Sequence, residues 1–230
     1  MKSGAISKRL AVCGELVRRG AILADVGTDH AYLPIHLLEL GKIKGCVLSD
    51  INEGPLASAR ANIAERGFSG MAKFFLTDGA AALSDCGATD YSICGMGGEL
   101  IAEIICAAPH LCNSSINLIL QPMSRPEALR AALFDNGFDI LDERYVTDMG
   151  KHYVCILASY SGTVRQYTQA DIHFGKEEFF SGELSHDMLL YMEERERVLT
   201  NVIRGKSKGG ESITEDVELL ECLKTRLKKL

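Results

Sequence analysis

Short apolar runs that end in Asp or Gly alternate with segments of helical periodicity over the first two thirds of the chain. AILADVG (21–27) and GCVLSD (45–50) are typical of buried strands, and each precedes a stretch in which apolar residues recur every three or four positions. Strands that alternate with helices pair through crossover connections, so the pattern predicts βαβ units around a parallel sheet.

The pattern gives a specific set of expected elements. Strands are expected at 21–27, 45–50, 72–78, 90–95 and 117–122. Helices are expected at 5–19, 32–40, 55–66, 99–106 and 126–136, with a short Ala-rich helical stretch after residue 78. Residues 138–162 predict two strands around a turn at Met149–Gly150, which would give an antiparallel edge strand. The expected fold class is therefore a Rossmann-like α/β domain.

The last part of the chain differs in character. The strand signal fades beyond Gly162, and apolar residues recur at helical spacing over 184–204 and again over 214–230. The polar segment RGKSKGGE at 204–211 separates them and predicts a turn. We expect an αα-hairpin, and hence two domains: a catalytic domain at 1–162 and a helical domain at 163–230.

Composition excludes several classes of protein. The 230 residues carry a net charge of −6, so any nucleic-acid contact must use a local basic patch. The eight Cys form no CxxC pair and the six His form no HxxxH pair, so no metal is expected. No run of 18 apolar residues and no signal-peptide pattern occur, so we expect no membrane span and a cytoplasmic protein.

The first candidate site is the turn DVGTDH at residues 25–30, between a strand and a helix. Ligands of open α/β sheets bind beyond the carboxyl ends of the strands, and Gly27 would let a ligand approach the backbone. Asp29 stands where a phosphate-binding GxGxxG turn has its second Gly, and its charge would repel a pyrophosphate. A cationic or polar ligand fits better. The alternative is a helix-capping role for Asp29.

The turns after the later strands supply further candidates. Asp50 follows Gly27 at about the spacing of an acid that binds both ribose hydroxyls. Asp78 and Gly79 could contact an adenine, and the glycines of Gly95–Gly98 leave space for a ligand or a substrate base. Gln121 could place an amide near the reacting centre. An ordinary turn or strand end is the alternative at each position.

Together these motifs resemble class I S-adenosylmethionine-dependent methyltransferases, and most closely the bacterial tRNA (adenine-22-N1)-methyltransferase family. The resemblance rests on SKRL (7–10), ADVGTDHAYLP (24–34), SDINEGPL (49–56), TDG (77–79), ICGMGGELI (93–101) and LILQPM (118–123). Members of that family often have Asn at the position of Met123. The segment after Gly162 resembles the family's C-terminal helical, coiled-coil domain.

The resemblance implies S-adenosylmethionine as cofactor, tRNA as substrate and a set of site residues. The implied cofactor-binding residues are Gly27, Asp29, His30, Asp50, Ile51, Asp78, Gly79, Gly95 and Gly97, and the implied catalytic residues are Asp29, Gly95, Met96 and Gln121. RNA would meet local cations, for which the candidates are Lys8, Arg9, Arg18, Arg19, Arg125, Arg130, Arg204, Lys206 and Lys208. A homodimer is also possible.

Three other functions stay open on the sequence. A nicotinamide-dependent oxidoreductase is disfavoured by the interrupted GxGxxG pattern. A non-catalytic Rossmann-like module could use its helical hairpin to recruit a partner. A methyltransferase of this class could also act on another RNA, a protein or a small molecule.

Overall fold

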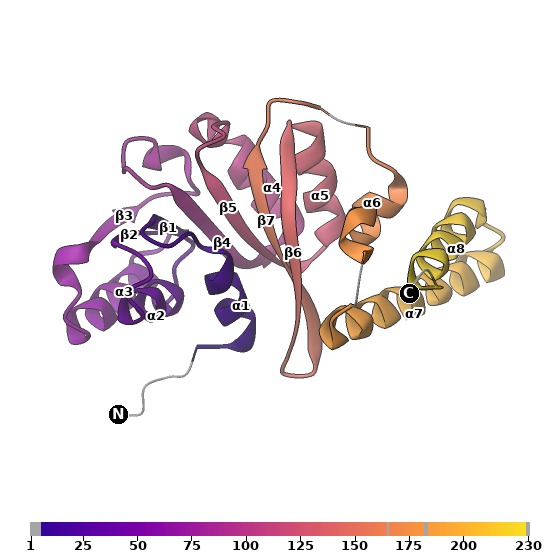
Figure 1. Ribbon diagram of the computed structural model, residues 1–230, viewed down its shortest axis with the longest axis horizontal. Coiled ribbons are helices and arrows are strands. Elements are labelled where there is room, and N and C mark those ends of the chain that lie inside the picture. Colours follow the sequence, from indigo (N-terminus) through magenta and orange to yellow (C-terminus); the bar gives the residue numbers. More distant parts are fainter. Residues whose placement is uncertain (1–5, 165, 182–183, 229–230) are drawn as a thin grey trace.

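The computed structural model describes residues 6–164, 166–181 and 184–228 and contains one seven-stranded sheet, in the order β3-β2-β1-β4-β5-β7-β6 (Figure 1). The strands are β1 (Ile22–Val26), β2 (Gly45–Asp50), β3 (Ala72–Leu76), β4 (Asp90–Gly97), β5 (Asn117–Ser124), β6 (Phe138–Asp148) and β7 (Lys151–Tyr160). Strands β1 to β5 pair in parallel, and β7 runs antiparallel to both of its neighbours. The predicted fold class, a Rossmann-like α/β domain with a mainly parallel sheet, is confirmed.

Helices cover both faces of this sheet. They are α1 (Lys8–Leu16), α2 (Tyr32–Glu39), α3 (Glu53–Glu65), α4 (Gly98–Cys106), α5 (Pro126–Asp135), α6 (Gln169–Phe174), α7 (His186–Gly209) and α8 (Thr214–Lys228), with short 3₁₀ turns η1 (Ser69–Met71), η2 (Ala81–Leu83), η3 (Pro109–Leu111) and η4 (Glu177–Phe180). Side chains of α1, α2 and α3 form one buried core, and those of α4 to α8 contribute to the other. Within β1, Leu23 belongs to the first core and Ala24 to the second, as strand alternation requires.

The predicted pair of strands around Met149–Gly150 forms the antiparallel edge of the sheet, but the sequence did not show the order of the two strands. Strand β7 lies between β5 and β6 and is antiparallel to both, so the strand at the edge is β6, which runs parallel to β5. A hairpin pattern shows that two strands pair, but it does not show which of them meets the sheet. Strand β7 occupies the inner position in the sheet and is buried along most of its length, whereas the edge strand β6 alternates buried and exposed residues.

Several boundaries also differ from expectation. Strand β4 continues to Gly97, so the expected glycine loop is largely strand, and the Ala-rich stretch forms only the 3₁₀ turn η2. Helix α1 begins after Ser7, whose hydroxyl accepts a hydrogen bond from the Leu10 amide, and α3 begins at Glu53. The expected helix ends at residue 5 and at 229–230 lie outside the described residues.

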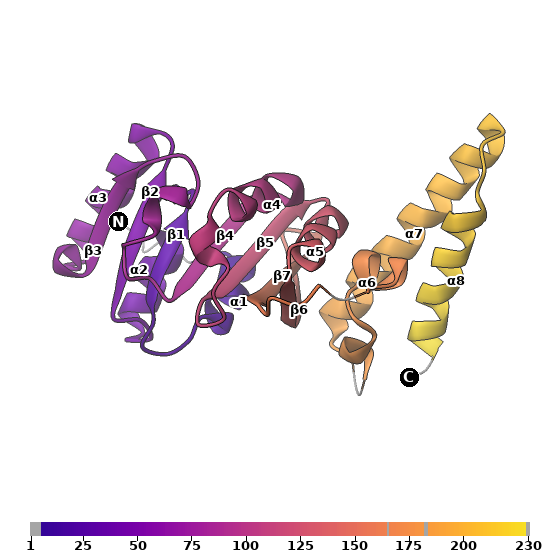
Figure 2. The same cartoon turned by 90° about the horizontal axis from the view of Figure 1, so that it is seen from above.

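The tail contains more helix than its sequence pattern indicated. Helix α7 continues to Gly209, so most of the predicted turn at 204–211 is helical, and the chain reverses at Gly210 with a left-handed φ of 74°. Helices α7 and α8 lie side by side and project away from the sheet (Figure 2). The sequence missed α6, although its capping box of Thr168 and Asp171 is a recognisable start signal.

A buried ion pair between α5 and β6 also binds the start of the tail. Arg130 of α5 donates to both carboxylate oxygens of Glu143 on β6, at 2.6 and 3.1 Å, and both side chains are fully buried. The same guanidinium donates to the carbonyls of Ile172 and His173 in α6, and the Tyr145 hydroxyl donates to Glu143. Strand β6, helix α5 and the start of the tail are thus held by one network.

We predict that Glu143→Ala destabilises the fold by about 3–5 kcal/mol, because it leaves the Arg130 guanidinium buried and unpaired. Urea unfolding measures the loss. Glu15→Ala is the matched control, since Glu15 pairs with Arg144 on the surface, where an ion pair contributes about 1 kcal/mol or less. Equal losses in the two variants would contradict the role assigned to the buried pair.

Candidate active site

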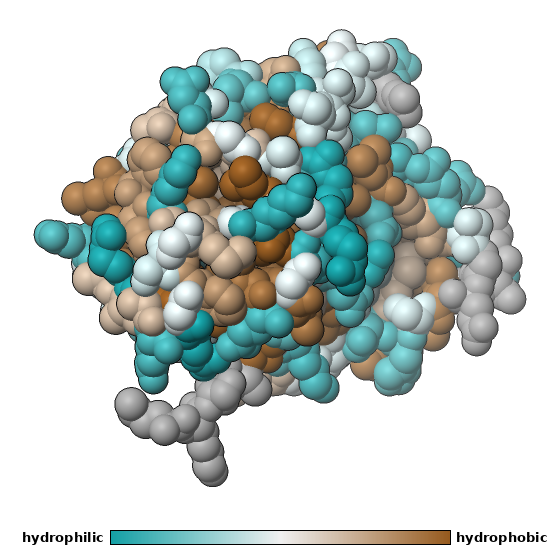
Figure 3. Space-filling model, turned by 60° about the vertical axis from the view of Figure 1, so that its left-hand side comes forward, coloured by the Kyte–Doolittle hydropathy of each residue, from teal (hydrophilic) through white to brown (hydrophobic). Residues whose placement is uncertain are grey.

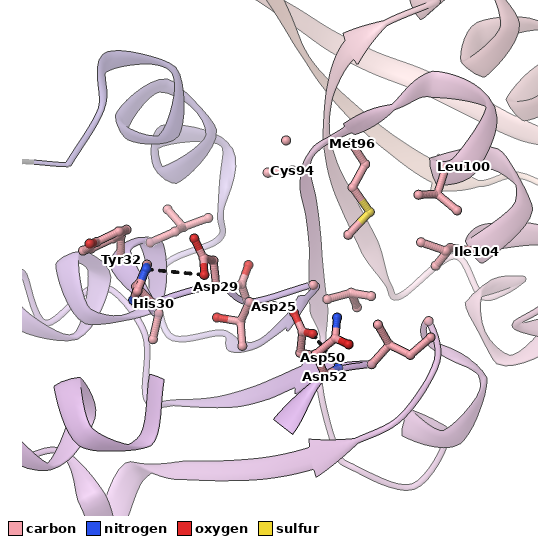
Figure 4. Close-up of a pocket in the computed structure, with 18 of the residues that line it drawn as sticks. Asp25, Asp29, His30, Tyr32, Asp50, Asn52, Cys94, Met96, Leu100 and Ile104 are labelled. Atoms are coloured by element: carbon pink, nitrogen blue, oxygen red, sulfur yellow. Dashed lines mark hydrogen bonds and ion pairs between the residues drawn. The ribbon is translucent and has the colours of Figure 1, made fainter. Parts of the chain in front are cut away.

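A cavity of 610 Å³ opens at the carboxyl ends of β1, β2 and β4. It is lined by Arg9, Leu10, Asp25, Val26, Gly27, Thr28, Asp29, His30, Ala31, Tyr32, Leu33, Asp50, Ile51, Asn52, Thr77, Asp78, Gly79, Cys94, Gly95, Met96, Leu100 and Ile104. Asp25, Asp29 and Asp50 lie on one side of it, and Met96, Leu100 and Ile104 face them from β4 and α4 (Figure 4). When the side of the molecule carrying β2 and β3 is turned forward, hydrophobic side chains reach the surface between hydrophilic ones (Figure 3).

The turn after β1 brings the backbone close to the cavity. The amides of Gly27 and Thr28 both donate to the Ser49 carbonyl on β2, at 2.8 and 2.9 Å. Gly27 has a left-handed φ of 74°, and a Cβ there would lie 2.0 Å from the terminal methyl of Met96. The left-handed φ favours glycine in this turn, and any larger residue would also have to displace the flexible end of the Met96 side chain.

The helix-capping interpretation of Asp29 is excluded by the geometry. The residue that precedes α2 is Ala31, in a left-handed conformation with φ of 58°, and no side chain caps the helix. The Asp29 side chain is 75% exposed and lies 3.4 Å from the Nε2 atom of His30. Its carboxylate is therefore available to a ligand in the cavity.

Asp50 is oriented by its own loop. One carboxylate oxygen accepts a hydrogen bond of 2.8 Å from the Asn52 amide, and α3 begins directly afterwards without a side-chain cap. The other carboxylate oxygen has no hydrogen bond among the residues that the structure describes. A carboxylate fixed in this way at the end of β2 is suited to accept hydroxyl donors.

Asp25, the first residue of the candidate turn at 25–30, forms a polar part of the wall, although the sequence assigned it no role of its own. Burial raises the pKa of its carboxyl above the ordinary value, and a 2.6 Å hydrogen bond from the Ser92 hydroxyl opposes part of that rise. The sequence also missed Asn52, Leu100 and Ile104. Asn52 follows a predicted site residue and was recognisable from that position, whereas the two α4 residues carry only an amphipathic pattern that fits any packed helix.

Two expected site residues do not line the cavity. Gln121 is fully buried and accepts a hydrogen bond of 2.8 Å from the Arg9 guanidinium, so it acts on the cavity only through Arg9. Gly97 precedes α4. Its neighbour Gly98 has a structural reason to be glycine, because a Cβ there would lie 2.2 Å from the Arg125 carbonyl oxygen. The other predicted site residues all line the cavity.

Several of the cations expected to meet RNA are engaged within the protein. Arg130 is buried, and Arg18 is bound to the buried Asp90 carboxylate. Arg125 pairs with Glu99 and Glu127, and Lys206 pairs with Asp216 at 2.6 Å. Arg130 is therefore excluded as an RNA contact. Apart from Glu127, which lies two residues after Arg125, the partners are ten or more residues away in the sequence, so local spacing did not show these pairs.

The charges of the cavity wall are predominantly negative. Carboxylates of Asp25, Asp29, Asp50 and Asp78 face it, against the cation Arg9 and the imidazole of His30. Among the described residues, no three His, Cys, Asp or Glu side chains are grouped as a metal site would require. The wall is therefore suited to a ligand that carries positive charge and hydroxyl groups.

Comparison with known proteins identifies the family. Residues 6–156 match the model of the methyltransferase domain. The chain is 33% identical over 153 residues to the tRNA (adenine(22)-N(1))-methyltransferase of Bacillus subtilis, an alignment that spans 66% of this chain and 64% of that protein. Sp1610 of Streptococcus pneumoniae, proposed to be a tRNA (m1A22) methyltransferase, superposes with a TM-score of 0.81 and 32% identity over 96% of this chain and 99% of that one.

This chain belongs to the tRNA (adenine-22-N1)-methyltransferase family. The same Streptococcus protein has been solved in complex with S-adenosyl-L-methionine, again with a TM-score of 0.81 and 32% identity, over 95% of this chain and 99% of that one. Likeness to this family therefore extends through the tail, beyond the segment that matches the domain model.

We predict that Gly98→Ala destabilises this family member by about 1–3 kcal/mol, because the added methyl must displace the Arg125 backbone. Gly97→Ser is the control. Its φ of −67° is ordinary, the nearest atom to a Cβ is 3.4 Å away, and Ser is favoured at a helix N-cap. Thermal unfolding compares the two. A Gly98→Ala protein as stable as Gly97→Ser would show that α4 and α5 tolerate a wider separation.

Proposed function

We propose that this protein is an S-adenosylmethionine-dependent methyltransferase that methylates N1 of adenine 22 in tRNA. The observation that carries the proposal is the cavity at the ends of β1, β2 and β4, with Asp50 at the end of β2, in a chain of this family. The Bacillus relative is named for this reaction. The sequence alignment spans 64% of that relative and 65% of a Mycoplasma genitalium relative, whereas the superposition on Sp1610 spans 99% of that chain.

The cavity fits the cofactor chemically. S-adenosylmethionine has no phosphate, carries a sulfonium and an ammonium group, and has two ribose hydroxyls. Asp50 would hold the hydroxyls, and Asp29 would face the ammonium. Asp78 and Gly79 would contact the adenine, with Leu100 and Ile104 beside them. A dinucleotide would instead bring its pyrophosphate against Asp29, which disfavours the oxidoreductase alternative.

The methyl transfer requires little acid–base catalysis from the protein. When bound, the cofactor supplies an electrophilic methyl group. The adenine N1 has a free in-plane lone pair, so no residue has to remove a proton before attack. The chain must orient N1 towards the cofactor, and orientation contributes up to about 7–11 kcal/mol to such reactions. The methylated ring is cationic, and the carboxylates of the wall favour that charge.

Gly95 and Met96 would border the target base. Gly95 has a left-handed φ of 80° and no side chain to obstruct entry, and the Arg9 guanidinium lies close to it. Arg9 is held by its hydrogen bond to Gln121, which gives the buried amide a positioning role and not a catalytic one. The wall on this side is thus fixed by a contact between α1 and β5.

We further propose that residues 1–162 form the catalytic domain and that 163–230 bind tRNA. The tail is firmly docked: Tyr191, Met192 and Leu223 lie in the same buried core as the sheet. Its RNA contacts would be made by Arg204 and Lys208, because Asp216 compensates the charge of Lys206. A protein that acts on tRNA would work in the cytoplasm. The described residues contain no helix of the length and hydropathy needed to cross a membrane. The homodimer expected from the sequence remains a prediction, which sedimentation analysis can test.

Mass spectrometry of tRNA nucleosides tests the proposal. Unmodified tRNA is incubated with the protein and S-adenosylmethionine, and 1-methyladenosine is expected only when both are present. Replacement of adenine 22 by guanine should abolish the product. No methylated nucleoside in the unaltered tRNA would overturn the assigned reaction, and methylation that survives the replacement would move it to another nucleotide.

We predict that Asp50→Ala weakens S-adenosylmethionine binding by about 10–150-fold, since hydrogen bonds to a charged group contribute about 1.5–3 kcal/mol. Titration calorimetry measures the affinity. Glu53→Ala is the control, because it removes a nearby carboxylate that does not line the cavity. An unchanged affinity in a folded Asp50→Ala protein would remove Asp50 from the ribose site.

We predict that Asp29→Ala lowers methyl transfer at subsaturating cofactor by about tenfold or more, through loss of a charged partner. The melting temperature should not change, because Asp29 caps no helix. Asp85→Ala, an exposed acid outside the cavity lining, serves as the control for a changed net charge. Unchanged activity together with a lower melting temperature would restore a structural role for Asp29.

A further inference from the structure

The tip of the β6–β7 hairpin exposes a hydrophobic side chain on a strained backbone. Met149 and Gly150 form a two-residue turn with φ of 49° and 75°, the type I′ geometry that favours Asn-Gly. Met149 is 97% exposed, more than any other large hydrophobic residue of the described chain. The left-handed backbone does not favour Met here, and the exposed side chain does not pack in the core. A function other than stabilising the fold would explain a Met at this position.

The tip stands at the edge of the sheet that carries the cavity. Strand β6 runs parallel to β5, so its carboxyl end lies at the same edge as those of β1, β2 and β4. The Asp148 carboxylate accepts a hydrogen bond of 3.5 Å from the backbone amide of Arg9, a residue of the cavity wall. Figure 1 shows the hairpin reaching beyond the other strands, with its tip near α1 and the start of α7.

Two exposed lysines near the tip are available to phosphate groups. Lys151 follows the turn and Lys8 begins α1; both are exposed, and neither forms an ion pair within the residues described. Asp148 and Asp187 lie here too. Asp148 accepts a hydrogen bond from the Arg9 amide and Asp187 accepts one of 3.1 Å from the Thr147 amide, but such bonds do not remove a carboxylate's charge, so the lysines would bind phosphates as individual side chains. A hydrogen bond of 2.9 Å between Thr147 and His152 stiffens the hairpin just below its tip.

We propose that Met149 is a wedge that enters the base stack of the RNA substrate when the target adenine leaves it. This inference rests on the proposed function. N1 lies on the Watson–Crick edge, so a paired or stacked adenine must be extruded before it can react. Extrusion leaves a gap in the stack, and Met is among the side chains that proteins insert between bases. Lys8 and Lys151 would hold the flanking phosphates.

Met149→Asn provides a sharp test, because Asn suits the turn better than Met. The variant should be at least as stable as the wild type in urea unfolding, and its cofactor affinity should be unchanged. Its kcat/KM for full-length tRNA should fall by about tenfold or more, a loss of about 1.4 kcal/mol in transition-state binding. Met149→Leu, which keeps an apolar side chain, should retain most of the activity.

Leu141→Asn is the matched control. Leu141 is an exposed apolar residue of the same hairpin, 49% accessible and roughly 25 Å from the tip along the strand. Its replacement should leave kcat/KM unchanged. If Leu141→Asn and Met149→Asn lower the activity equally, hydrophobic surface in general is responsible and the wedge is excluded.

A second measurement reports on the base itself. With 2-aminopurine in place of the target adenine, binding of the wild-type protein should raise the fluorescence as the base unstacks, and Met149→Asn should give a much smaller rise. Equal rises, or equal kcat/KM values, would overturn the wedge while leaving the proposed function intact. A wild-type protein that methylates no tRNA would instead overturn the proposed function.

Discussion

The parallel pairing of β1 with β4 is the constraint on which the site depends. From β1 the sheet continues through β2 to β3 on one side, and from β4 it continues through β5 on the other. The chain leaves β1 towards the helices of one face and leaves β4 towards those of the opposite face. The two connections therefore separate at the carboxyl edge, and the cavity occupies the space between them. Gly27 and Met96, one from each connection, meet across this space.

A second constraint ties the tail to this arrangement. The carboxylate of Glu143 and the guanidinium of Arg130 are buried together, and the backbone carbonyls of α6 satisfy the remaining donors. At the far end of α8, Arg226 donates to the Gly175 carbonyl and pairs with Asp171 of α6. Polar groups removed from water must find such partners, so the tail cannot move away from the sheet without removing two hydrogen-bond acceptors from the buried Arg130 guanidinium. The helical hairpin is thus carried at a fixed position relative to the site.

Much of the fold and of the site followed from local pattern. The strand ends that bear Gly27, Asp50 and Gly79 were recognisable because a turn that needs a glycine, or an acid at the end of a buried strand, is visible in a few consecutive residues. The failures share a different cause. The burial of Gln121, the contact of Arg125 with Gly98, and the pairing of Lys206 with Asp216 each depend on segments that meet only after folding. The order of β6 and β7, which the sequence left open, was decided by the same kind of contact.

The sequence by itself determined the alternation of strands and helices and the types of residue at each strand end. It also carried the motifs that resemble one family. These properties are local, because periodicity and turn chemistry act over fewer than about twenty residues. Only the tertiary structure decided which of those side chains share one cavity and which cations form ion pairs within the protein. It also decided where the hairpin tip with Met149 lies relative to the site. Those outcomes depend on strand order and on contacts between distant segments, because the burial and ion pairing of a residue are determined by its neighbours in the folded protein.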